Sequence, residues 1–163
     1  MNFFQKEDVR ILVVDDEKTM ADTLVEYLSE LGYGAVAAYG AHEGLSAFEK
    51  GDFQLVITDL VMPEMDGMAL LDAITRLDSR AMVIVVTGHS TVESAVAAIK
   101  KGAYDFISKP FKMDELKIIV ERALERHTIR RQLGTFRGLT LALLVSIPVW
   151  LVLGIVLAWM WKG

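Results

Sequence analysis

The chain has 163 residues, 53% of them hydrophobic and 24% charged, a composition too apolar for a disordered protein. It contains no cysteine, which excludes disulfide bonds and thiolate metal sites. Residues 1–121 hold 11 Lys and Arg against 21 Asp and Glu, a net charge of −10, so this part is a poor candidate for binding nucleic acid.

Short apolar runs alternate with amphipathic segments over most of the chain. Each run is short, several are rich in β-branched residues, and Gly or polar residues bound most of them, which indicates buried strands. The five expected strands are Val9–Val14, Ala35–Ala38, Phe53–Thr58, Met82–Thr87 and Asp105–Ser108.

The segments between these runs have helical periodicity. Met20, Leu24 and Leu28 share one face of the first segment, and Gly32 follows its end. The five expected helices are Thr19–Leu31, Ala41–Lys50, Met68–Leu77, Thr91–Lys101 and Met113–Phe136. This alternation of strands and helices predicts an α/β fold, a doubly wound parallel sheet with helices on both faces.

The C-terminal part differs in kind, because residues 138–161 contain no charged side chain. A helix of this length rises far enough to cross a hydrocarbon core of roughly 30 Å. Arg137 precedes the segment, and Trp159, Trp161 and Lys162 follow the pattern of interfacial anchors. We expect a transmembrane helix here; a buried core helix of a larger fold is the alternative.

The charges before this segment suggest how the chain would lie at a membrane. Residues 122–137 carry five arginines against Glu125 alone, a net charge of +4 that favours contact with anionic lipid headgroups. The excess of basic residues before the span predicts a tail anchor with the N-terminal body in the cytoplasm, most simply at a bacterial inner membrane. The expected divisions are an arm at 1–8, a domain at 9–126, a basic linker at 127–137, the span at 138–161 and a tail at 162–163.

Chemically active side chains follow the expected strands at their carboxyl ends. Asp15 and Asp16 follow the first strand, Asp59 the third, Lys109 the fifth, and Thr87 ends the fourth. Doubly wound sheets bind their ligands at this edge, so we expect these groups to converge. The alternative is structural: Asp15 and Asp16 would cap the next helix, and Asp59 would start a turn.

Three crowded carboxylates remain ionised most easily around a cation, and an oxygen-only donor set suits Mg²⁺, with Mn²⁺ as a second choice. A carboxylate that attacks phosphorus forms an aspartyl phosphate. In that chemistry Lys109 would supply positive charge to the phosphoryl oxygens, and Thr87 would supply a hydroxyl donor. The pattern therefore predicts phosphoryl transfer to Asp59.

Four motifs together resemble the receiver domain of two-component response regulators, with a flavodoxin-like (βα)5 fold and sheet order 2-1-3-4-5. The residues in these motifs are most similar to those of receivers in the nitrogen-regulatory and dicarboxylate-regulatory branch of the family. The motifs are Val-Val-Asp15-Asp16-Glu17, Ile-Thr-Asp59-Leu-Val-Met62-Pro63-Glu-Met-Asp66-Gly67, Val-Val-Thr87-Gly88-His89 and Gly102-Ala-Tyr-Asp-Phe106-Ile-Ser-Lys109-Pro110-Phe111.

The resemblance implies that a sensor histidine kinase or a phosphotransfer protein phosphorylates Asp59. Asp16, Asp59 and the main-chain carbonyl of Val61 would bind Mg²⁺ directly, and Asp15 would act through water. Gly88 would leave space for the phosphoryl group.

The resemblance also implies a change of conformation on phosphorylation, in which further residues would take part. The Lys109–Pro110 bond would be cis, and Thr87 would move and let the ring of Phe106 rotate inward; a plain core role for Phe106 is the alternative. Val61 and His89 would tune the lifetime of the phosphoryl group, although His89 also fits a surface residue without a role.

The resemblance implies a phosphoacceptor and not an enzyme. An aspartyl phosphatase fits less well, because such enzymes usually place the nucleophile after the first strand with a second Asp two residues later, whereas Asp15 and Asp16 are adjacent. We expect signalling through a partner, or a homodimer formed by the fourth helix, fifth strand and fifth helix, without direct DNA binding. The alternative is a membrane-anchored phosphate sink or scaffold whose phosphorylation has no output.

Overall fold

The computed structural model of the chain describes residues 6–128 and residue 161. The chain divides into two units, Met1–His127 and Thr128–Gly163. A short 3-10 helix, Lys6–Asp8, precedes the first strand of the first unit.

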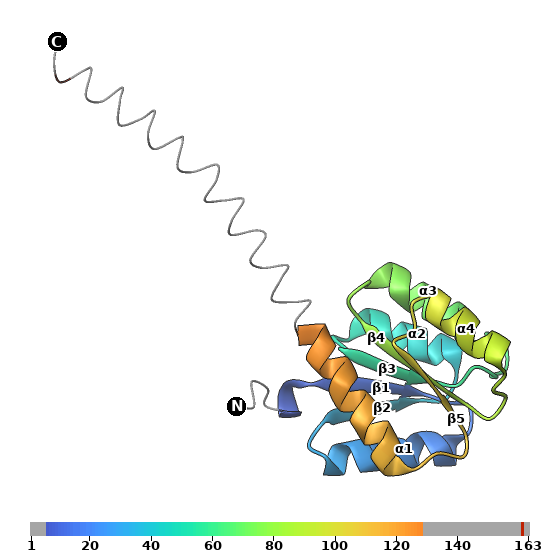
Figure 1. The fold of residues 1–163 in the computed structure, drawn as a ribbon. Coiled ribbons are helices and arrows are strands. Elements are labelled where there is room, and N and C mark those ends of the chain that lie inside the picture. Colours follow the sequence, from blue (N-terminus) through green and yellow to red (C-terminus); the bar gives the residue numbers. More distant parts are fainter. Residues whose placement is uncertain (1–5, 129–160, 162–163) are drawn as a thin grey trace. The chain divides into compact units, whose positions relative to one another are not determined.

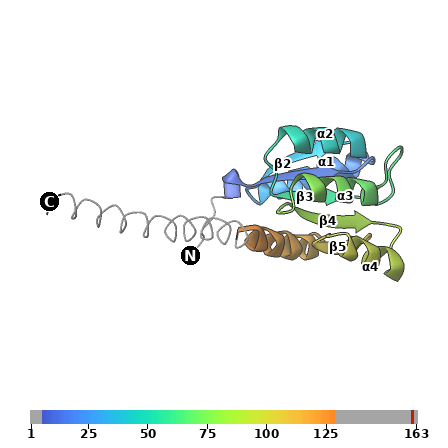
Figure 2. The same ribbon diagram turned by 90° about the horizontal axis from the view of Figure 1, so that it is seen from above.

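Five parallel strands form one sheet within the described residues, in the order β2-β1-β3-β4-β5 (Figures 1 and 2). The strand order predicted from the resemblance is therefore confirmed, as is the doubly wound α/β class. The strands are β1 Arg10–Val14, β2 Gly34–Ala38, β3 Leu55–Thr58, β4 Met82–Thr87 and β5 Asp105–Ser108.

Helices cover both faces of the sheet. The labelled helices are α1 Lys18–Glu30, α2 Ala41–Lys50, α3 Gly67–Leu77 and α4 Val92–Lys100. Residues 113–128 form a further helix, drawn in orange in Figure 1. The rest of the expected fifth helix, residues 129–136, lies outside the described residues.

Alternate side chains of the central strands enter two separate cores, as the period of two in a strand requires. Ile11 and Val13 of β1 pack with side chains of α1 and of the helix of residues 113–128. We call this cluster the α1-side core. Leu12 and Val14 pack with side chains of α2, α3 and α4. We call this cluster the α2-side core. The sheet is thus buried on both faces, which fixes its carboxyl edge as the place for polar chemistry.

The predicted localisation of the chain, a membrane-anchored protein, is contradicted. Within residues 6–128 and 161, no helix is long and apolar enough to cross a membrane. The labelled helices have 9 to 13 residues and each carries charged side chains, whereas a span needs about 20 apolar residues. Apart from Trp161, the segment 138–161 that suggested a span lies outside the described residues.

Candidate functional site

Main-chain hydrogen bonds fix the expected site residues at the carboxyl edge of the sheet. The amide of Asp15 donates to the Ala38 carbonyl (3.1 Å), and the amide of Asp59 donates to the Val14 carbonyl (3.1 Å). Asp15 and Asp59 therefore extend β1 and β3 by one residue each, so their side chains leave the backbone from fixed, neighbouring positions.

Lys109 is held at the same edge. Its amide donates to the Thr87 carbonyl (2.8 Å), which extends β5 along β4. Its ammonium nitrogen lies 2.8 Å from Oδ2 of Asp15 and 2.8 Å from Oδ2 of Asp59. The structure thus brings together three of the residues that the sequence predicted to converge.

The second oxygen of each carboxylate is held by its own loop. Oδ1 of Asp59 accepts a hydrogen bond from the Val61 amide (3.1 Å), and Oδ1 of Asp15 accepts one from the Glu17 amide (2.9 Å). Each carboxylate is therefore fixed by its own backbone through one oxygen and faces Lys109 with the other. Glu17 is the residue that precedes the first turn of α1, so neither Asp15 nor Asp16 is its N-cap.

The electrostatics of the site favour its charged form. Burial alone raises the pKa of the Asp59 carboxyl. The Lys109 ammonium, the Thr87 hydroxyl and the Val61 amide together lower it by more than burial raises it, so the pKa lies below its usual value. For Lys109, burial lowers the pKa, and the hydrogen bonds to Asp15 and Asp59 raise it by more. Only 12% of the Asp59 side chain and 16% of the Lys109 side chain are exposed, so solvent screens this pair weakly.

Thr87 ends β4 and is fully buried. Its hydroxyl oxygen accepts a hydrogen bond from the His89 amide (3.2 Å). Because the oxygen is used as an acceptor, the hydroxyl hydrogen is left to donate to Asp59, whose pKa this hydroxyl helps to lower. A β-carbon added to Gly88 would meet no atom within 4 Å, so open space lies beside Thr87. The His89 side chain is exposed.

Gly67 is a residue for which the sequence suggested no role, although it belongs to one of the four motifs. It begins α3 and its amide donates to the Leu60 carbonyl (2.9 Å), which closes the loop after Asp59. Asp66 caps the same helix by accepting a hydrogen bond from the Ala69 amide (2.7 Å). The sequence signal was an Asp-Gly pair ahead of a helical segment, but the requirement for glycine comes from the packing of α3 on the backbone of Asp59.

The donor set for a metal is only partly assembled. Asp16 is exposed, and no group of three or more acidic or histidine side chains suited to a metal occurs among the residues that the structure describes. The charges nevertheless fit a divalent cation: Asp15, Asp16 and Asp59 carry −3, Lys109 carries +1, and −2 remains. Oxygen ligands of this kind match Mg²⁺.

The remaining predicted residues lie around this centre. The Lys109–Pro110 peptide bond is cis. Phe106 is half-buried and packs against the α2-side core. Val61 is 53% exposed.

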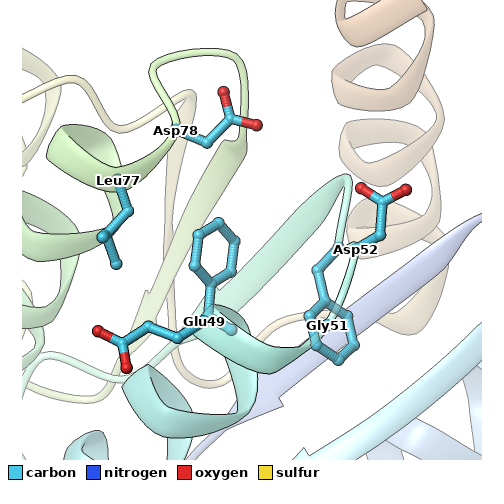
Figure 3. A pocket seen from close by; sticks show the side chains of 7 residues that line it. Glu49, Gly51, Asp52, Leu77 and Asp78 are labelled. Atoms are coloured by element: carbon cyan, nitrogen blue, oxygen red, sulfur yellow. The ribbon is translucent and has the colours of Figure 1, made fainter.

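A separate hollow of about 360 Å³ lies between the ends of α2 and α3 (Figure 3). None of the predicted site residues lines it. Its lining consists of Phe48, Glu49, Gly51, Asp52, Phe53, Leu77 and Asp78.

Comparison with known proteins agrees with this geometry. Residues 11–121 match the family described as the response regulator receiver domain. The nitrogen assimilation regulatory protein NtrX of Azorhizobium caulinodans is 40% identical over 132 residues, which are 80% of this chain and 29% of NtrX. The chain therefore spans less than a third of the length of this relative.

Two solved structures extend the comparison. A response regulator receiver domain protein from Clostridium thermocellum superposes with a TM-score of 0.71 at 32% identity, covering 74% of this chain and 98% of that one. The beryllofluoride-activated NtrC4 receiver domain dimer superposes with a TM-score of 0.69 at 37% identity, covering 72% of this chain and 98% of that one.

Proposed function

Because the chain belongs to the response regulator receiver family, whose members are phosphoacceptors, we propose that Asp59 accepts a phosphoryl group from a histidine kinase or a phosphotransfer protein. The observation that carries this proposal is the position of the Lys109 ammonium, 2.8 Å from both Asp15 and Asp59. A lysine held between two carboxylates that follow the adjacent strands β1 and β3 places fixed positive charge where a phosphoryl group would add negative charge.

In the proposed transfer, a carboxylate oxygen of Asp59 attacks phosphorus as the bond from phosphorus to the donor's imidazole nitrogen breaks. The imidazole leaves with the electron pair of that bond, and Asp59 becomes an aspartyl phosphate. The lowered pKa of Asp59 keeps the nucleophile ionised at neutral pH. Lys109 and the Thr87 hydroxyl then donate to the phosphoryl oxygens.

We assign the metal ligands to Asp15, Asp16, Asp59 and the main-chain carbonyl of Val61, with Asp15 acting through water. These residues would hold Mg²⁺, or Mn²⁺ in its place, which would supply positive charge to the transferred group. The residual charge of −2 around Lys109 supports this assignment. Calorimetric titration with Mg²⁺ tests it, and undiminished Mg²⁺ binding by an Asp16→Asn, Asp59→Asn double variant would refute it.

Labelling of the protein tests the phosphoacceptor directly. The full chain is incubated with Mg²⁺ and a histidine kinase, or with phosphoramidate as a small donor, and the phosphoryl group is located by mass spectrometry. We expect a single modified residue, Asp59, and none in Asp59→Asn. Asp52→Asn, a matched change at an exposed carboxylate far from the site, should be labelled like wild type. Undiminished labelling of Asp59→Asn would refute the proposal.

The output surface that we propose is α4, β5 and the helix of residues 113–128. Val92, Val96 and Ile99 lie at helical spacing on α4 with 76%, 46% and 48% of their surface exposed. Exposed apolar stripes of this kind mark interaction sites. A second copy of this chain is the occupant that we favour, since the related NtrC4 receiver domain forms a dimer when activated by beryllofluoride.

Sedimentation with and without beryllofluoride tests the output surface. We expect the mimic to increase the dimer fraction of wild type and not of Val96→Asp. A phosphate sink without output predicts no change in mass for either protein, and that result would contradict the dimer.

A further inference from the structure

A hydrogen bond between distant segments joins α1 to the start of the helix of residues 113–128. The Tyr27 hydroxyl donates to the main-chain oxygen of Met113 at 3.1 Å, across 86 residues of sequence. Tyr27 and Met113 are both half-buried. Figure 1 shows α1 and the orange helix next to each other on the same side of the sheet, and both contribute to the α1-side core.

Met113 ends a short segment that begins at the functional site. The segment 109–113 starts where the Lys109 amide donates to the Thr87 carbonyl (2.8 Å), and Phe111 packs against the α1-side core in its middle. Tyr27 holds its far end. The segment that carries the site lysine is thus fixed by β4 at one end and by α1 at the other.

The same helix is tied to the acidic side of the site. The Glu17 amide, directly before α1, donates to Oδ1 of Asp15 at 2.9 Å. One helix therefore contacts both the loop that carries Asp15 and the segment that carries Lys109. A rigid element that holds both partners fixes the distance between them.

We propose that Tyr27 is a positioning residue, which fixes segment 109–113 against α1 and so keeps the Lys109 ammonium between Asp15 and Asp59. This inference rests on the proposed phosphoacceptor function. Tyr27 acts through Lys109 and touches no reacting atom. A purely structural tyrosine would instead affect global stability, and its loss would change the site equally with and without Lys109.

The first test is a double-mutant cycle on phosphoryl transfer from phosphoramidate, a donor too small to need a docking surface. We expect Tyr27→Phe to lower the initial rate about threefold to tenfold, as misplacement of a catalytic group does. In a Lys109→Met background the same change should lower the rate by less than about twofold. Tyr33→Phe, the same loss of a hydroxyl at the opposite edge of the sheet, should leave the rate at the wild-type value.

The second test follows amide hydrogen exchange and needs no phosphoryl transfer. We expect Tyr27→Phe to speed exchange of the Lys109 amide about threefold to tenfold, while the Asp59 amide, bonded to β1, stays within about twofold of wild type. This measurement also decides the matter if the Lys109→Met rate is too slow to measure. Acceleration of both amides by the same factor would show a global effect and overturn the inference.

The inference and the proposed function fail in different ways. Wild type without a phosphoryl group on Asp59 would refute the proposed function whatever Tyr27 does. Suppose instead that wild type is labelled on Asp59, but Tyr27→Phe leaves the rate of phosphoryl transfer unchanged or lowers it equally in the wild-type and Lys109→Met backgrounds. That result would leave the proposed function intact and refute the role of Tyr27.

Discussion

A β-carbon placed on Gly67 would lie 1.9 Å from the main-chain oxygen of Asp59. The first turn of α3 therefore packs directly on the backbone of the proposed phosphoacceptor. Contact with a main-chain atom cannot be relieved by rotating a side chain, so the position of α3 and the position of Asp59 depend on each other.

Replacement of Gly67 by alanine should destabilise the domain and displace Asp59. We expect Gly67→Ala to lower the free energy of unfolding by at least about 2 kcal/mol, because overpacking forces the backbone to move. Urea unfolding measures this change. Gly88→Ala is the matched control: a β-carbon there meets no atom within 4 Å, so its stability should stay within about 0.5 kcal/mol of wild type.

Removal of the Lys109 charge should have opposite effects on folding and on metal binding. Lys109→Met leaves the carboxylates of Asp15 and Asp59 without their cation, and we expect a loss of about 3 kcal/mol in the free energy of unfolding. Removal of the Lys109 charge should also tighten Mg²⁺ binding, which calorimetry measures, and it should slow phosphoryl transfer. Lys112→Met, at an exposed position in the same segment, should change neither; weaker Mg²⁺ binding in Lys109→Met would contradict this expectation.

The stability of the domain should depend on the ionisation of Asp59. Burial raises the pKa of this carboxyl, but Lys109, Thr87 and Val61 together lower it by more, so that it lies below the value of 3.8 for the unfolded chain. Its contribution to stability is therefore complete above pH 3.8 and disappears as pH falls through the lower folded-state pKa. Acidification should then narrow the stability difference between wild type and Asp59→Asn.

Urea unfolding at pH 7 and at pH 3 or below measures that narrowing. In a Lys109→Met background the narrowing should be smaller, since Lys109 is the strongest of the groups that lower the pKa of Asp59. A stability difference that is the same at both pH values would contradict the prediction.

The aspartyl phosphate should hydrolyse slowly. Val61 is 53% exposed beside Asp59 and has no polar side-chain atom to orient an attacking water. We expect Val61→Gln to shorten the half-life of the phosphoryl group, because an amide beside the site can position water. Decay of labelled protein after removal of the donor gives the half-life, and a half-life of seconds in wild type would contradict the prediction.

Glu64 should be a site of stored strain. Its φ of 69° lies in the left-handed region, which costs a residue other than Gly, Asn or Asp roughly 1 kcal/mol. Glu64→Asn should therefore raise the free energy of unfolding by about 0.5–1 kcal/mol. The contact with His42 that is lost, at 3.7 Å, is an ion pair only when the imidazole is protonated, and it joins exposed side chains and so contributes little to stability.

The matched control for Glu64 is His42→Ala, which removes the same ion pair without changing the backbone preference. It should change the stability by less than about 0.5 kcal/mol. A loss in Glu64→Asn as large as the loss in His42→Ala would show that the ion pair outweighs the strain.

The order and kind of the elements can be predicted from the sequence alone, because periodicity is a local property. The continuous apolar run that becomes the buried strand β1 and the glycine after α1 can both be seen in a window of a few residues. The same local logic predicted that Asp15, Asp59 and Lys109 would meet, since parallel strands bring their carboxyl ends to one edge. The predicted start of the third strand was wrong by two residues: Phe53 lies outside β3, which begins at Leu55.

The way in which those residues meet follows from the packing of the folded chain. No local pattern predicts that one lysine contacts two carboxylates from different strands, that α3 leaves no room for a side chain on Gly67, or that Tyr27 holds Met113. Each of these contacts depends on distances of a few ångströms between segments far apart in the chain, and such distances are set by the packing of whole helices on the sheet.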